Sequence, residues 1–172
     1  MLRGLTAILL ASALVAGCGH SIGDSCSVNI DCDPLGQRFC DTSAPGGYCT
    51  IDGCDVGTCP SEAVCIRFFT PVANEPCIAG LMYPENGCRA DERCVCDLSV
   101  GDVCQTPTNA VNGENGHCAP ETTERRWCQK SCGSDGDCRP GYECRSTGTL
   151  GAEPVPSLDM GTVPAKFCAP AG

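Results

Sequence analysis

The pattern of apolar and polar residues divides the chain into a short leader and a long remainder. Residues 1–3 form a basic start, and residues 4–16 are apolar or small apart from Thr6 and Ser12. A charged segment followed by such a run is typical of an export signal. The run is too short to span a bilayer, which requires about 20 apolar residues, and no later stretch is apolar enough. The pattern therefore predicts an exported protein.

After the leader, apolar residues occur in short segments that cysteine, glycine and proline interrupt. The chain holds 19 cysteines, 21 glycines and 13 prolines in 172 residues, and glycine and proline punctuate regular structure. We therefore expect a small disulfide-rich fold of tandem cysteine modules, built from short β-ribbons and turns with little helix. The best helical candidate is residues 151–160, where Pro154 and Pro156 argue against a helix.

Composition and charge narrow the class of partner. The formal net charge is −10, and nucleic-acid binding needs a basic patch, so we expect no nucleic acid as a partner. A chain this acidic also cannot use a polybasic segment to hold an anionic membrane. Large aliphatic and phenylalanine side chains are too few for one sizeable core. Disulfides, which persist in the oxidising compartment that export implies, must supply the constraint, each contributing about 2–4 kcal/mol.

The leader ends in a short sequence with a signature of its own. Residues 15–17 are valine, alanine and glycine, so an apolar run and small residues lead directly to Cys18. This sequence resembles the lipobox of bacterial lipoproteins. The resemblance implies a signal peptide over residues 1–17, cleavage before Cys18, and a diacylglycerol on its sulfur that anchors the protein in a membrane. Residues 18–25 would then be a lipidated tether at the bacterial cell envelope, at the outer membrane or cell surface.

An ordinary secretory signal is the alternative, and it would leave Cys18 free to pair. Parity favours the lipobox, because lipidation of one of 19 cysteines leaves an even set. An odd cysteine in a secreted protein needs a separate explanation. Fully extended, the residues between Cys18 and Cys26 reach about 25 Å, so we expect the folded part close to its membrane. Apart from the lipid on Cys18, no cofactor is expected.

The remaining cysteines fall into four blocks with related spacing. The first block reads C-x5-C-x7-C-x8-C, and the last contains C-x5-C-x5-C-x23-C, each with an aspartate, Asp31 or Asp137, before the second of these cysteines. The second block reads C-x4-C-x5-C-x11-C and would close at Cys77, whereas the third fits less well. The predicted cysteine modules cover residues 26–49, 50–87, 88–118 and 119–172.

Eighteen cysteines are predicted to form disulfides once Cys18 is set aside. The blocks hold four, four, five and five cysteines, so the two odd blocks cannot both close internally. We expect a bridge between them, with Cys118 and Cys128 as the nearest pair, and in the first block we expect first-to-third and second-to-fourth pairing. The predicted disulfide cysteines are Cys26, Cys32, Cys40, Cys49, Cys54, Cys59, Cys65, Cys77, Cys88, Cys94, Cys96, Cys104, Cys118, Cys128, Cys132, Cys138, Cys144 and Cys168.

Two stretches, residues 26–49 and 132–168, share the aspartate before the second cysteine and an aromatic residue directly before a later one. This pattern resembles the N-terminal cysteine-rich domain of the dickkopf family, and also the cysteine-rich lipoproteins of large-genome predatory and soil bacteria. The dickkopf family acts by binding a receptor. The resemblance therefore implies an extracellular binding module, whose partner would be an unknown protein or glycan.

Acidic turns offer weak calcium candidates. Asn29, Asp31 and Asp33 alternate as at the start of an EF-hand loop, but the glycine and glutamate that such a loop requires are missing. Asp135 and Asp137 form a second cluster of oxygen ligands. The alternative interpretation is a solvated acidic turn whose carboxylates accept backbone hydrogen bonds.

Zinc and catalysis find less support in the sequence. Structural zinc sites use paired cysteines two to four residues apart, whereas five residues is the commonest spacing here. The two histidines, His20 in the tether and His117 in a loop, belong to no recognised catalytic motif. We therefore expect no metal bound through cysteine, and no enzyme activity.

Two further features bear on contacts with a partner. Adjacent residues of an extended segment point to opposite faces, so Phe68 and Phe69 can both be buried only if the segment is covered on both sides. An exposed one would be a contact candidate. Residues 145–167 are rich in glycine, proline, serine and threonine, and we expect a mobile surface loop in the C-terminal module.

The expected function is that of a lipid-anchored, non-enzymatic surface protein that binds or recognises a partner at the envelope. A small protease inhibitor is the rival, because long loops on rigid frames carry function and residues 145–167 could present one. A purely structural envelope protein is a third possibility.

Overall fold

Short antiparallel strands carry the fold. The computed structural model describes residues 19–70, 76–78, 87–95, 116–148, 152–155 and 164–171. These residues hold a single α-helix of four residues, which confirms the predicted small disulfide-rich fold with little helix. The elements are α1 (Asn29–Cys32), β1 (Phe39–Asp41), β2 (Tyr48–Thr50), β3 (Ala63–Phe68), β4 (Pro76–Cys77), β5 (Glu92–Val95), β6 (Gly116–Pro120), η3 (Glu121–Thr123), β7 (Arg125–Lys130), η4 (Asp135–Asp137), β8 (Tyr142–Ser146), β9 (Ala152–Pro154) and β10 (Lys166–Pro170).

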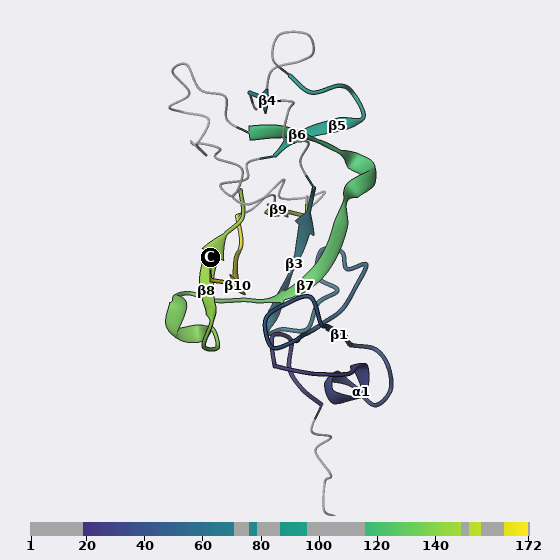
Figure 1. Cartoon of the computed structure of the whole chain (residues 1–172), viewed down its shortest axis with the longest axis vertical. Helices are drawn as coiled ribbons and strands as arrows, with labels where there is room; N and C mark the ends of the chain where they lie inside the picture. The colour runs from purple at the N-terminus through teal and green to yellow at the C-terminus, as the bar shows by residue number, and fades with distance from the viewer. Residues whose placement is uncertain are drawn as a thin grey trace, which may run out of the picture.

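The strands form four small sheets. The strand orders are β1-β2, β10-β8, β7-β3-β9 and β4-β6-β5, and all the pairs are antiparallel. Helix α1 and strand β1 lie at one end of the molecule, and the β4-β6-β5 sheet lies at the other (Figure 1). Strands β3 and β7 run between these two ends and connect them (Figure 1).

The disulfides group the cysteines into four units with one bridge order. In each unit the first cysteine pairs with the third and the second pairs with the fourth, as predicted for the first block. Cys18, Cys96 and Cys104 lie outside the described residues. The units are unit 1 (Cys26, Cys32, Cys40, Cys49), unit 2 (Cys54, Cys59, Cys65, Cys128), unit 3 (Cys77, Cys88, Cys94, Cys118) and unit 4 (Cys132, Cys138, Cys144, Cys168).

The units also share their strand register. In each one the third cysteine lies opposite the fourth across an antiparallel pair, as Cys40 does to Cys49 and Cys144 to Cys168. The equivalent pairs in units 2 and 3 are Cys65 with Cys128 and Cys94 with Cys118. Because cross-strand neighbours are close in space, the paired strands hold the third and fourth cysteines side by side, where their bridges to the first and second stack on each other.

A shared turn follows the second cysteine. In units 2, 3 and 4 the residue after that cysteine accepts a hydrogen bond from the N–H that lies two residues before the third. The donor and acceptor residues are Ala63 and Pro60, Glu92 and Arg89, and Tyr142 and Arg139, at 2.9, 3.0 and 3.0 Å. The five-residue spacing between these cysteines therefore has a structural meaning, since it is the length that this turn requires.

Unit 3 is inserted into unit 2. Cys65, the third cysteine of unit 2, is followed by all of unit 3 before Cys128 completes the unit, and Cys59 and Cys128 are 69 residues apart. The predicted closure of the second block at Cys77 is therefore wrong, because Cys77 opens unit 3 by pairing with Cys94. Dividing the sequence into consecutive blocks cannot reveal this nesting. The pairing of β3 with β7 joins segments that lie before and after unit 3 in the sequence.

The predicted bridge between Cys118 and Cys128 is also wrong. Cys118 pairs with Cys88 within unit 3, and Cys128 pairs with Cys59. The parity argument expected a bridge that joins the two odd blocks directly. Instead, the bridges Cys77–Cys94 and Cys59–Cys128 each join one of the odd blocks to the second block.

Aromatic side chains join unit 1 to unit 4. The rings of Tyr48 and Tyr142 are stacked with centroids 5.5 Å apart, and the guanidinium of Arg139 lies 4.1 Å from the Tyr142 ring and donates to the Pro45 carbonyl at 2.8 Å. Burial raises the pKa of Tyr48 to about 12, so its hydroxyl stays protonated while it accepts the Lys130 N–H at 2.9 Å. These contacts fix the two units relative to each other.

Candidate functional site

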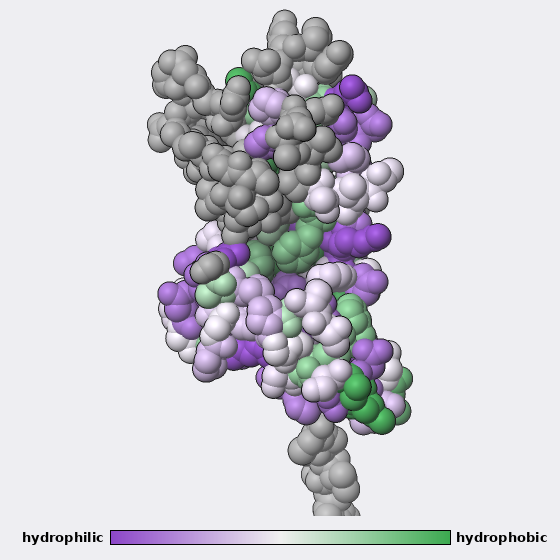
Figure 2. Space-filling view, viewed as in Figure 1, coloured by the Kyte–Doolittle hydropathy of each residue, from purple (hydrophilic) through white to green (hydrophobic). Residues whose placement is uncertain are grey.

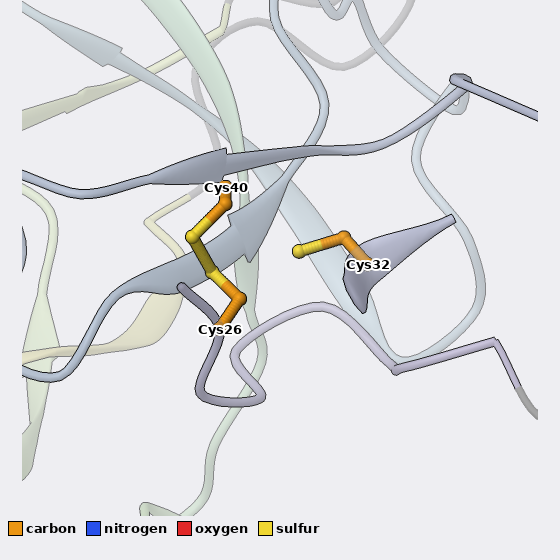
Figure 3. A group of neighbouring side chains, drawn as sticks. All are labelled: Cys26, Cys32 and Cys40. Atoms are coloured by element: carbon orange, nitrogen blue, oxygen red, sulfur yellow. A yellow bond between two sulfur atoms is a disulfide. The ribbon is translucent and has the colours of Figure 1, made fainter. Parts of the chain in front are cut away.

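The cysteine clusters that could suggest metal sites are pairs of stacked disulfides. In unit 1 the sulfurs of Cys26, Cys32 and Cys40 lie within 4.8 Å of one another. The bond between Cys26 and Cys40 lies beside the Cys32 sulfur (Figure 3), which forms the second bridge with Cys49. Equivalent groups occur in the other three units. A metal binds the thiolate form of cysteine, and the sulfurs of these clusters are bonded to one another instead.

The calcium candidates of unit 1 hold their own turn together. One carboxylate oxygen of Asp31 accepts the N–H groups of Ser27 and Val28 at 2.8 and 3.1 Å. Asp33 accepts the N–H groups of Leu35 and Gln37, both at 2.9 Å. These backbone hydrogen bonds favour the ionised carboxylates and lower the pKa of both groups. The acidic turn therefore has the backbone hydrogen bonds expected of the alternative to a calcium site.

Unit 4 repeats the Asp31 arrangement of unit 1 at equivalent positions. One oxygen of Asp137 accepts the N–H groups of Gly133 and Ser134 at 2.8 and 2.9 Å, which lowers its pKa in the same way. Asp135 accepts the N–H of Cys144 at 2.8 Å, and in unit 1 the side chain at the same position, Asn29, accepts the N–H of the third cysteine at 3.0 Å. We call this set of bonds the aspartate clasp.

The adjacent phenylalanines are both covered. Phe69 is 6% exposed and lies between the guanidinium groups of Arg67 and Arg93, at 5.4 and 5.7 Å from its ring centroid. Phe68 packs on the other face against the rings of Trp127 and Phe167. The segment is thus covered on both sides, so neither phenylalanine is an exposed contact residue.

The segment expected to form a mobile loop is partly a strand. Residues Ala152–Pro154 form β9, which pairs with β3 at the edge of the three-stranded sheet. Ala152 is buried, and its carbonyl accepts the Gly148 N–H at 2.7 Å. The mobile-loop prediction is wrong for these residues and for the residues that form β10, because pairing with β3 and β8 orders them. Residues 149–151 and 156–163 lie outside the described residues.

The segment before the first bridged cysteine is folded into the molecule. Ile22 is fully buried and packs with the Tyr48 and Tyr142 side chains. The Gly23 N–H donates to the Cys49 carbonyl at 2.9 Å. Gly23 has a φ of +94°, and a Cβ there would lie 2.9 Å from the side chain of Lys130, so only glycine suits this position. These residues, which fall in the range 18–25 that the sequence assigns to a tether, therefore belong to the folded part.

Exposed apolar side chains gather at the end of the molecule where this segment begins. Among the described residues, four large apolar side chains are exposed, and three of them belong to unit 1: Val28 at 54%, Ile30 at 67% and Leu35 at 85%. They form an apolar surface around α1 (Figure 2). We call these three side chains the apolar patch. An open groove of about 540 Å³ beside it is lined by Gly19 and Leu35 together.

Comparison with known proteins adds no relative from which a function could be inferred. No family model, no curated protein and no solved structure matches the chain. The many disulfides indicate an exported protein. No helix among the described residues has the length and apolarity needed to cross a membrane. The sequence patterns identified the acidic turns and the pairing within the first block. The burial of Ile22 and the apolar patch were missed, because single apolar residues carry no periodic signal.

Proposed function

We propose that the protein is a lipid-anchored binding module of the bacterial envelope, without enzymatic activity. Its supports are the lipobox resemblance at Cys18 and one structural observation. The chain packs against unit 1 from Ile22 onward, so only a few residues separate the lipidated cysteine from the folded part. A lipid on Cys18 would hold the whole molecule directly at the membrane surface, in one orientation.

The bridged units suit recognition of a partner. A surface that is ordered before binding loses little conformational entropy when a ligand binds, and disulfide bridges supply that order without a large core. The β4-β6-β5 sheet lies at the opposite end from α1 (Figure 1), so anchoring at Cys18 would present it away from the membrane. Its partner would be a protein or a glycan of the envelope or its surroundings.

The anchor is tested by replacing the lipidated cysteine. Cys18→Ala should move the protein from the detergent phase to the aqueous phase in detergent partitioning, because no acyl chain can then be attached. Val56→Ala, which alters an exposed side chain elsewhere, should leave partitioning unchanged. A Cys18→Ala protein that still entered the detergent phase would contradict the proposal.

The partner is tested with residues 19–172 exported behind a cleavable secretory signal. Immobilised in its oxidised form, this protein should capture a specific envelope component that the reduced protein does not capture. Equal capture by both forms would indicate non-specific adhesion and contradict recognition by the folded units.

A further inference from the structure

We propose that the apolar patch of Val28, Ile30 and Leu35 inserts into the lipid surface beside the anchor. This inference rests on the proposed lipidation of Cys18. It assigns unit 1 a second, non-covalent contact with the membrane, which would orient the molecule as well as retain it. The occupant of the patch is therefore a lipid surface.

Position is the first argument. Gly19, the residue after the proposed lipidated cysteine, lines the same groove as Leu35, and a Cβ on Gly19 would lie 3.8 Å from the Cys32 carbonyl oxygen at the end of α1. Cys18 directly precedes Gly19 in the sequence, and consecutive Cα atoms are about 3.8 Å apart, so a lipid attached there would begin one residue away from this groove. The buried Ile22 fixes the segment in place. An acyl chain on Cys18 and the patch can therefore reach one lipid surface together.

Comparison with unit 4 is the second argument. Val28 and Ile30 follow the first cysteine of unit 1 by two and four residues, and the equivalent residues of unit 4 are Ser134 and Gly136. Both units make the same aspartate clasp. The clasp thus does not require apolar side chains at these positions. Scattered exposed apolar residues are ordinary, whereas a cluster of them marks an interaction surface.

Loop length gives the same result for the third residue of the patch. The second and third cysteines are separated by seven residues in unit 1 and by five in unit 4. Leu35 lies in this longer loop, and the residue is 85% exposed. The longer loop therefore carries an apolar side chain to the surface, and the carboxylate of Asp33 holds it there by accepting the N–H of Leu35.

Charge decides the kind of lipid. Asp31 and Asp33 adjoin the patch, Arg38 lies beside the same groove, and the whole chain carries a formal charge of −10. This arrangement offers no attraction to an anionic headgroup layer. Insertion would therefore depend on apolar contact, would tolerate salt, and would suit a zwitterionic surface such as phosphatidylcholine.

Depth-dependent quenching tests the contact. The lipidated protein is reconstituted on phosphatidylcholine vesicles in which the acyl chains carry bromine, and tryptophan fluorescence is compared with that on unbrominated vesicles. Ile30→Trp should lose at least twofold more of its added fluorescence than Val56→Trp. Val56 is a matched control, since it is the fourth exposed large apolar residue and lines a separate groove. Trp127 gives the same background in both variants.

Three outcomes would overturn the inference, and they are distinguishable. If the variants float with vesicles but Ile30→Trp is quenched no more than Val56→Trp, the anchor holds and the patch does not contact lipid. If the variants do not float at all, the lipid anchor itself fails. If residues 19–172 sediment as a dimer that Ile30→Ser converts to a monomer, the patch binds a second copy of the chain instead.

Discussion

Unit 1 and unit 4 are built on the same backbone plan but meet different surroundings. In each, the first and second cysteines bridge to the third and fourth, and an aspartate before the second cysteine accepts two N–H groups. Unit 1 adds a buried Ile22 before its first cysteine and an exposed apolar patch. Unit 4 has serine and glycine where unit 1 has Val28 and Ile30.

This comparison separates two roles that one short sequence performs. The cysteines and the clasp aspartates determine the shared backbone, and they occupy equivalent positions in both units. The remaining positions do not determine the backbone, because the same backbone forms with either apolar or polar side chains there. Differences between the units therefore point to function, whereas their similarities point to folding.

Reduction should abolish both units together, and this is the largest effect we expect. Each bridge typically contributes about 2–4 kcal/mol by restricting the unfolded chain, and the buried clusters of unit 1 consist largely of its own cysteines. Reduction at neutral pH without denaturant should eliminate the near-ultraviolet circular dichroism and open the chain to protease. A reduced protein that kept its protease resistance would indicate a sufficient apolar core and contradict this account.

Replacing Ile22 should test how the segment before the first cysteine of unit 1 is held in the molecule. Ile22 is fully buried, and Ile22→Ala should lower the free energy of unfolding by about 2–5 kcal/mol, as for other large-to-small changes in a core. Urea unfolding of the oxidised protein measures this change in the free energy of unfolding. The matched control is Ile30→Ala, which removes the same atoms from an exposed position.

An equal effect of the two alanine variants would contradict the packing of Ile22. A large effect of Ile22→Ala should also expose the segment that follows Gly19 to protease, since Ile22 is its fully buried side chain. Ile30→Ala should leave cleavage there unchanged.

Cysteine spacing predicted the bridge order of unit 1 and showed that unit 4 resembles it, because a five-residue interval and an aspartate before the second cysteine are local features. Nesting of unit 3 in unit 2 could not be predicted, since Cys59 and Cys128 meet only through the pairing of β3 with β7. The strand at Ala152–Pro154 was hidden by its prolines, which an edge strand tolerates. The apolar patch emerged only from exposure in the folded chain.

Removing either clasp should have the same, smaller effect. Asp31→Ala and Asp137→Ala each leave two backbone N–H groups without their acceptor, and both turns are exposed to water, which partly replaces the lost bonds. We expect a modest and equal decrease in the urea midpoint of the two variants. Asp41→Ala is a control, as that carboxylate accepts only from the nearby Ser43. Clearly unequal decreases would contradict the equivalence of the two clasps.

Acid should weaken both clasps over one pH range, and this is the smallest effect. The pKa values of Asp31 and Asp137 are lowered by backbone hydrogen bonds to the ionised carboxylates. The folded protein therefore binds protons less readily than the unfolded chain at these groups. Their contribution to stability is complete above the unfolded pKa and is lost as the pH falls through the lowered folded value, which places the loss below about pH 4.

Asp31→Asn and Asp137→Asn remove this dependence, so each variant should unfold more easily than the wild type at pH 7 and approach it in strong acid. Urea midpoints from pH 7 to pH 2 measure the difference. A gap that stayed constant in either unit would mean that its aspartate is not held by its ionised form, and the two units would then differ in the clasp itself and not only in their surfaces.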